Sequence, residues 1–148
     1  MAYEEKYMDM ALDLAKKAEQ KGEVPVGAVI VIDGKVMAKA YNQREGKADA
    51  TAHAEILAIK KACKKVKNFR LLGAELYVSL EPCVMCMGAI LNARISTVYF
   101  GASITGGSIR AKELSERAGL NHTAKVEGGY KQEECSTLIS NYFKSKRH

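Results

Sequence analysis

The sequence predicts a single α/β domain whose partly parallel sheet is covered by helices on both faces. In the middle of the chain, apolar segments typical of strands alternate with segments of helical periodicity. Such alternation indicates crossover connections, which join parallel strands and place helices against the sheet. The 148 residues are enough to bury one core, and they contain no internal repeat, linker or low-complexity tract. We therefore expect one domain over residues 1–148.

The chain is expected to begin with a helix followed by a hairpin. Apolar residues recur at helical spacing over 2–21, and Gly22 follows as a stop signal. Two strands are predicted at about 25–32 and 35–42. Because the dipeptide Asp33-Gly34 between them favours a two-residue turn, we expect these strands to pair as a hairpin.

The remaining elements are predicted in the order helix, strand, helix, strand, loop and helix. The first of these helices starts at His53, and its apolar face is expected to consist of Ile56, Ile59, Cys63 and Val66. A strand, a helix and another strand are predicted at 74–80, 83–93 and 95–102. Residues 103–123 are polar and predict a loop with at most one short helix, and 131–146 predict the closing helix.

The net charge and the hydropathy of the sequence indicate which partner and which compartment to expect. The net charge is +6, from 23 basic and 17 acidic residues, which is compatible with a polyanionic partner such as nucleic acid. The N-terminus lacks a basic region followed by an apolar run, and no stretch approaches the roughly 18 apolar residues of a membrane span. We therefore expect a cytoplasmic protein, in which thiols stay reduced.

The stretch "SLEPCVMCMGAIL" (79–91) contains a Cys-x-x-Cys pair, Cys83 and Cys86. The same spacing occurs in thioredoxin-like redox sites, disulfides, structural zinc clips and catalytic metal sites. A reducing compartment argues against a disulfide. The other two cysteines, Cys63 and Cys135, are single and lie on apolar faces of predicted helices, where buried inert thiols are expected. A four-cysteine zinc ribbon is therefore excluded.

His53 and the two cysteines stand at the starts of predicted helices. Helices that follow side-by-side parallel strands begin at the same edge of the sheet, so these residues could meet there with Glu55 beside them. One imidazole and two thiolates with an open fourth position are typical of a catalytic zinc. Pro82 suits the start of the second of these helices, and helix N-termini favour thiolates.

The combination His-x-Glu and, after a long gap, Pro-Cys-x-x-Cys resembles the signature of the zinc nucleobase deaminases. The chain as a whole resembles the bacterial tRNA adenosine deaminases, which convert the wobble adenosine of the anticodon to inosine. The resemblance covers nearly the whole length. Its segments are "EVPVGAVIV" (23–31), "TAHAEI" (51–56), "LYVSLEPCVMCMGAI" (76–90), "NH" (121–122) and "EECSTLISNYF" (133–143).

This resemblance implies a cytidine-deaminase-like three-layer α/β/α fold with a mixed five-stranded sheet. It also implies that His53, Cys83 and Cys86 bind one zinc ion per chain and that Glu55 transfers protons. Asn42 would donate or accept a hydrogen bond with the target nucleotide, and backbone amides near Glu55 and Cys83 would stabilise the tetrahedral intermediate. The partner would be a tRNA anticodon loop, bound across the interface of a homodimer.

The sequence departs from the family pattern in one segment near the predicted site. Family members commonly have an arginine, an aspartate and a lysine soon after the Phe-Gly of the fourth strand. Here "FGASITGGSIRAKEL" (100–114) is about two residues shorter, with Ser103 and Ile104 where charged residues are expected. Family members also often have a proline where Ala50 stands. The altered segment Ser103–Gly107 leaves open an alternative substrate, a free base or nucleoside such as guanine or cytosine.

A third hypothesis is a non-catalytic nucleic-acid-binding module with a structural zinc. Glu55 argues against it, because a structural site has no use for a carboxylate that binds no metal. The basic chain end, with Lys144, Lys146 and Arg147, is expected either to contact RNA phosphate or to be a solvated terminus. No role is predicted for His122.

Overall fold

The computed structural model describes residues 2–103, 110–119 and 121–146. Its helices are α1 (Glu5–Gln20), α2 (Ala54–Val66), α3 (Val84–Asn92), α4 (Arg110–Arg117) and α5 (Gln132–Ser145). Its strands are β1 (Gly27–Ile32), β2 (Lys35–Tyr41), β3 (Ala74–Leu80), β4 (Thr97–Ala102) and β5 (Lys125–Glu127). None of the helices in this described part is long and apolar enough to cross a membrane.

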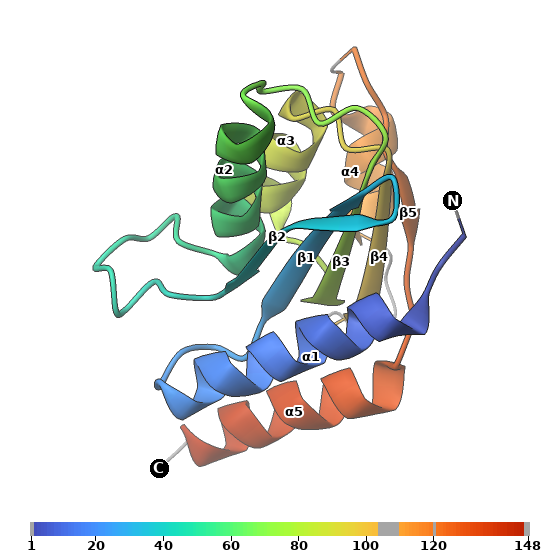
Figure 1. The fold of residues 1–148 in the computed structure, drawn as a ribbon. Helices are drawn as coiled ribbons and strands as arrows, with labels where there is room; N and C mark the ends of the chain where they lie inside the picture. Colours follow the sequence, from blue (N-terminus) through green and yellow to red (C-terminus); the bar gives the residue numbers. More distant parts are fainter. Residues whose placement is uncertain (1, 104–109, 120, 147–148) are drawn as a thin grey trace.

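The five strands form one mixed sheet in the order β2-β1-β3-β4-β5. Strand β1 is antiparallel to β2 and β3, whereas β3, β4 and β5 are parallel to one another. Helices α1 and α5 cover one face of the sheet, and α2, α3 and α4 cover the other (Figure 1). The predicted three-layer α/β/α architecture with a mixed five-stranded sheet is confirmed.

The central strands are buried on both faces, as their nearly continuous apolar sequences predict. One core cluster lies between the sheet and the helices α2, α3 and α4, and it is built largely from aliphatic residues and alanines. The cluster under α1 is richer in tyrosine and includes Tyr7, Tyr77 and Tyr99. A third, small cluster of Leu12, Ala102 and Cys135 joins α1, β4 and α5. Separate clusters therefore fix the helices to the two faces of the sheet.

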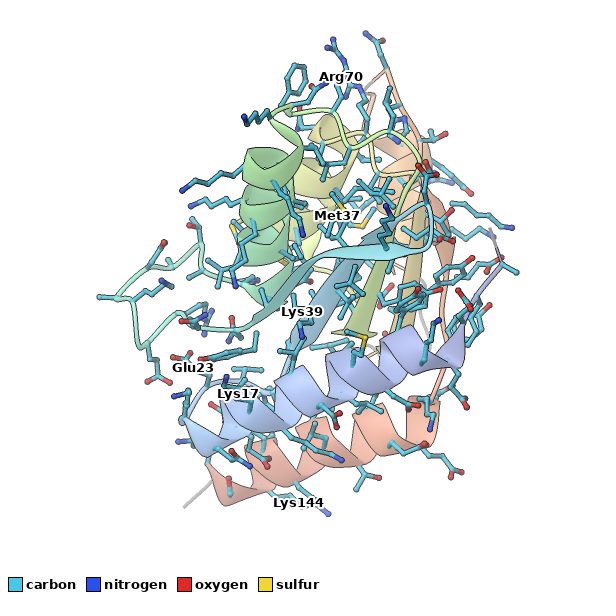
Figure 2. The ribbon with its side chains drawn as sticks, in the orientation of Figure 1. Lys17, Glu23, Met37, Lys39, Arg70 and Lys144 are labelled. Carbon is cyan, nitrogen blue, oxygen red and sulfur yellow. The ribbon has the colours of Figure 1, made fainter. Side chains whose placement is uncertain are left out.

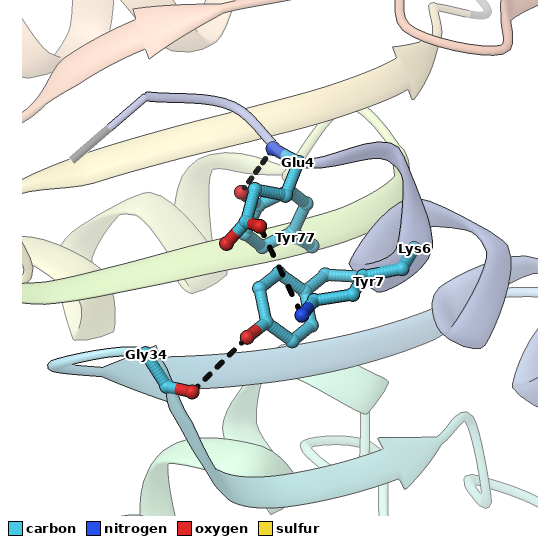
Figure 3. A network of polar contacts seen from close by, with 5 residues as sticks. All are labelled: Glu4, Lys6, Tyr7, Gly34 and Tyr77. Atoms are coloured by element: carbon cyan, nitrogen blue, oxygen red, sulfur yellow. Dashed lines mark hydrogen bonds and ion pairs between the residues drawn. The ribbon is translucent and has the colours of Figure 1, made fainter.

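The N-terminal helix is attached to the sheet by polar contacts as well as by packing. The hairpin turn is present, with positive φ at Asp33 (51°) and Gly34 (74°), as the sequence predicts. The Tyr7 hydroxyl donates a hydrogen bond of 3.1 Å to the Gly34 carbonyl (Figure 3). The backbone N–H of Glu4 donates to the Tyr77 hydroxyl at 3.0 Å. These bonds hold the start of α1 against β3 and the hairpin.

The last third of the chain contains one strand that the sequence pattern did not predict. Helix α4 is the short helix that the prediction allowed within 103–123, whereas β5 is a strand of three residues without an apolar pattern. The buried Ser115 hydroxyl donates to the Ala124 carbonyl at 2.7 Å and accepts from the Ala124 N–H at 2.8 Å. His122 Nε2 donates to the Ile95 carbonyl at 2.7 Å, so this histidine holds the chain that leads into β5.

The face of α2 that meets the sheet differs from the predicted one. Its buried side chains include Leu57, Ala58 and Ala62, whereas Ile59 and Cys63 are only half-buried at the margin of the core. Small alanines allow the helix to approach the strands closely, which displaces the larger aliphatic residues to the edge. The expectation of a buried Cys63 is therefore wrong, while Cys135 is buried as expected.

Candidate metal centre and pocket

The predicted metal ligands lie at the starts of two helices. His53 is the residue immediately before α2, Cys83 is the residue immediately before α3, and Cys86 lies in the first turn of α3. The predicted reason for their meeting is partly wrong, because β1 lies between the strands β2 and β3 that precede these helices. The residues meet because β2 and β3 run in the same direction and α2 packs against α3. Both helices therefore begin at the same end of the sheet.

The three side chains converge closely enough to share one metal ion. His53 Nδ1 lies 3.7 Å from Cys83 Sγ and 3.5 Å from Cys86 Sγ. Tetrahedral zinc, with Zn–S about 2.3 Å and Zn–N about 2.0 Å, requires a nitrogen–sulfur separation of about 3.5 Å. The donor set therefore fits zinc. Among the residues that the structure describes, no other trio of His, Cys, Asp or Glu side chains converges in this way.

The two thiols have opposite pKa shifts. The Cys86 thiol donates a hydrogen bond to Cys83, and this bond, with backbone N–H groups of Cys86 and Met85, lowers the pKa of Cys83 to about 5. The same bond raises the pKa of Cys86, whose side chain is also fully buried. The lowered pKa of Cys83 favours its thiolate, which is the form that binds zinc.

Alkylation should reveal this difference. In chelator-treated protein at pH 6, iodoacetamide is expected to modify Cys83 before Cys63, because the pKa of Cys83 is about 5 whereas burial raises that of Cys63. The rate at Cys83 should rise as the pH increases through 5 and then level off. Peptide mass spectrometry measures the order, and Cys83→Ser provides the control. Equal labelling of both thiols at pH 6 would contradict the assignment.

Glu55 lies in the first turn of α2, two residues after His53, and is 4% exposed. Burial raises the pKa of its carboxyl to about 7, and the negative charge at Cys83 contributes in the same direction. A carboxyl group with this pKa can both accept and donate a proton near neutral pH.

A cavity of about 190 Å³ opens beside these residues. Asn42, which follows β2 and is 4% exposed, lines it together with His53, Glu55 and Cys83. The structure therefore brings every predicted site residue except Cys86 to one cavity wall, and Cys86 is buried directly behind. The remaining lining residues, which sequence reasoning missed, are Val24, Val26, Arg44, Leu80, Glu81, Arg110 and Phe143.

A further buried carboxylate supports the loop that carries Asn42. Glu23, which is labelled in Figure 2, lies in the connection between α1 and β1. Its carboxylate accepts hydrogen bonds from the backbone N–H groups of Glu45 (3.1 Å) and Gly46 (2.7 Å). Its side chain is nearly inaccessible, being 3% exposed. The only sequence signal for this role was its place in the family-like segment 23–31.

The chain matches known proteins over most of its length. The family model for the cytidine and deoxycytidylate deaminase zinc-binding region matches residues 1–102. A tRNA-specific adenosine deaminase of Bacillus subtilis is 46% identical, over 99% of this chain and 92% of the relative. A tRNA-specific adenosine deaminase of Aquifex aeolicus is also 46% identical, over 97% of this chain and 96% of the relative.

Solved structures give the same result for the fold. A tRNA:A34 deaminase from work on A-to-I editing at the wobble position superimposes with a TM-score of 0.85 at 39% identity, covering 91% of this chain and 99% of that one. A guanine deaminase from Nitrosomonas europaea superimposes with a TM-score of 0.80, over 96% of this chain and 85% of that one, but is only 22% identical and shows the shared fold alone. The chain therefore belongs to the cytidine and deoxycytidylate deaminase family, within the group of the tRNA-specific adenosine deaminases.

Proposed function

We propose that this protein is a zinc-dependent hydrolytic deaminase that converts adenosine to inosine at the wobble position of tRNA. The observation that supports the proposal is the convergence of His53, Cys83 and Cys86 beside a cavity that the buried Glu55 also lines. The identity of 46% to tRNA-specific adenosine deaminases supports the choice of substrate. Cytoplasmic location remains a prediction.

In this proposal His53, Cys83 and Cys86 hold one zinc ion per chain. The ion, when bound, lowers the pKa of a water molecule in its open fourth position. Two thiolates cancel the formal charge of the ion and make this acidification weaker than three neutral imidazoles would. The site therefore needs a base close by, and Glu55 is the carboxylate that lines the same cavity beside His53.

Glu55 moves two protons during the reaction. It first accepts a proton from the water that attacks C6 of adenine and delivers it to the ring nitrogen N1. It then transfers the proton of the new C6 hydroxyl group to the exocyclic amine, which leaves as ammonia. The pKa of about 7 allows the same carboxyl group to act as base and as acid. Water and adenosine are thus converted to ammonia and inosine without another reactant.

The cavity suits one base taken out of its stack. Its volume of about 190 Å³ is smaller than the roughly 300–1,000 Å³ typical of drug-sized ligands. Asn42 is placed to hydrogen-bond the flipped nucleotide. Phe143, 41% exposed on the cavity wall, offers an aromatic face on which an unpaired base can stack.

A homodimer and phosphate contacts by the chain end belong to the same proposal. Val84, next to Cys83, is 67% exposed, so an apolar side chain beside the site is left for a second copy to cover. Lys144 (Figure 2) and Lys146 follow Phe143 at the end of α5. We expect them to contact phosphates of an RNA that reaches the cavity. Arg147 lies outside the described residues.

One observation favours a second candidate, a deaminase of a free base or nucleoside. Ser103 stands where the resemblance implies a charged residue, and its hydroxyl donates to the Glu81 carboxylate at 2.6 Å. The Ser103 side chain is therefore hydrogen-bonded to another residue of the protein. The rest of the altered segment, including Ile104, lies outside the described residues. The non-catalytic alternative does not account for a buried carboxyl group beside the ligands.

A substrate panel tests the proposed function. We expect inosine formation in an arginine-tRNA anticodon stem-loop, with little ammonia release from free adenosine, cytosine or guanine. Because phosphate contacts release counterions, stem-loop binding should weaken steeply with salt. The measurements are inosine by nucleoside mass spectrometry and ammonia by a coupled assay. Rapid turnover of any free base with an inert stem-loop would refute the RNA assignment and favour the second candidate.

A further inference from the structure

One buried carboxylate connects the metal-binding turn with the opposite wall of the cavity. Glu81, two residues before Cys83, is 5% exposed. Its backbone N–H donates to the Ala102 carbonyl at 2.8 Å. Its Oε1 accepts from the Ser103 hydroxyl at 2.6 Å, and its Oε2 accepts from the Ala111 N–H at 2.8 Å. Glu81 therefore binds the chain both after β4 and at the start of α4.

These contacts hold the backbone next to Arg110. Ala111 is fully buried, so the Glu81 bond to its amide holds the first turn of α4 in one place. Arg110, the preceding residue, has an exposed side chain that lines the cavity. It forms no ion pair within the part of the chain that the structure describes. Its side chain therefore adds a positive charge to the cavity lining.

The topology places a second arginine at a distance across the cavity. Arg44 follows β2 and Arg110 follows β4, and the strands β1 and β3 lie between these two strands in the sheet. Both arginines line the cavity that contains His53 and Glu55. A nucleotide that enters this cavity therefore meets two guanidinium groups, one from the chain after β2 and one from the chain after β4.

We propose that Arg110 contacts a phosphate group next to the flipped nucleotide, and that Glu81 is the positioning residue that holds Arg110 in place. The inference rests on the proposed function and names a contact of that same site. The resemblance implies charged residues near Ser103, and Arg110 supplies such a charge from a later position in the chain. Glu81 itself transfers no proton, because both of its oxygens are engaged by protein donors.

Arg110→Ala tests the phosphate contact. The KM for the anticodon stem-loop is expected to rise about fivefold to tenfold with little change in kcat, and the slope of log K against log salt should fall by about 0.7. Arg110→Lys should recover part of the loss. Lys112→Ala is the matched control, because it removes one exposed charge from the same helix outside the cavity.

The outcomes separate the inference from the proposed function. If the wild-type protein deaminates the stem-loop and Arg110→Ala behaves like Lys112→Ala, the phosphate contact is wrong and the function stands. If the stem-loop is inert while a free base reacts, the function and the phosphate contact both fail.

Glu81→Asp tests the positioning role with two readouts. The shorter side chain cannot reach both donors, so the Ala111 amide should exchange its hydrogen faster while zinc content stays at the wild-type value. The KM should rise as in Arg110→Ala, and the double variant should be no worse than Arg110→Ala alone. Glu81→Gln, which keeps the length and one acceptor, should have a smaller effect.

A purely structural role of Glu81 gives a different pattern. The losses from Glu81→Asp and Arg110→Ala would then add, and that result would overturn the positioning role. Glu81→Gln keeps the experiment decisive if Glu81→Asp does not fold, because it keeps the length of the side chain and removes the charge that both donors face. Faster exchange at Ala111 with an unchanged KM in either variant would contradict the positioning role.

Discussion

Glu55→Ala is expected to lower kcat for deamination by about 10²–10⁴-fold without removing the metal. In the proposed mechanism Glu55 transfers the protons, and burial raises the pKa of its carboxyl to about 7. The group that could hold the metal consists of His53, Cys83 and Cys86 and does not include Glu55. Glu55→Gln, which keeps the size of the side chain, should lose nearly as much activity. Single-turnover inosine formation and atomic absorption on the same samples measure the two quantities.

Cys86→Ser is the contrasting variant. Cys86 is fully buried and 3.5 Å from His53 Nδ1, so its loss should lower zinc content and thermal stability together. Zinc-free Glu55→Ala protein would identify Glu55 as a ligand and make the proposed proton transfers wrong. An active Glu55→Ala protein would show that another group moves the protons.

Much of the candidate site was predictable because its residues belong to short local motifs. His53 and Glu55 are two residues apart at the start of one helix, and Cys83 and Cys86 occupy the start of another. Local spacing therefore predicts each half of the site. The way in which the halves meet depends on the long-range insertion of β1 between β2 and β3, for which the sequence contains no local signal.

The features that the sequence did not predict depend on contacts between residues that are far apart in the chain. Strand β5 has three residues, too few for a period, and it is fixed by the Ser115 hydroxyl bonds to Ala124. The cavity residues Val24 and Phe143 come from opposite ends of the chain and carry no common motif. The elements of nine residues or more and the strands β2 and β3 were predicted within a few residues, because their apolar periodicity is long enough to identify them.

Gly27→Ala is expected to destabilise the fold by about 3 kcal/mol or more. Gly27 begins β1 at the place where α1 crosses the sheet. A methyl group there would overlap the Ala11 carbonyl and lie 2.7 Å from Leu14 Cβ and 2.8 Å from Ala15 N. Two of the three contacts are backbone atoms of α1, so no side-chain rotation can relieve them and the helix itself must move.

Denaturant unfolding measures this loss, with Gly88→Ala as the control. A methyl group at Gly88, inside α3, meets no heavy atom within 4 Å, and its helical setting should make the change neutral or stabilising by roughly 0.5–1 kcal/mol. Equal midpoints for the two variants would show that α1 does not pack on β1 as closely as described. Gly27 also donates its N–H to the Ser79 hydroxyl at 3.1 Å and follows Val26 of the cavity wall. Displacement of α1 in Gly27→Ala should therefore reduce deamination even at temperatures where the protein remains folded.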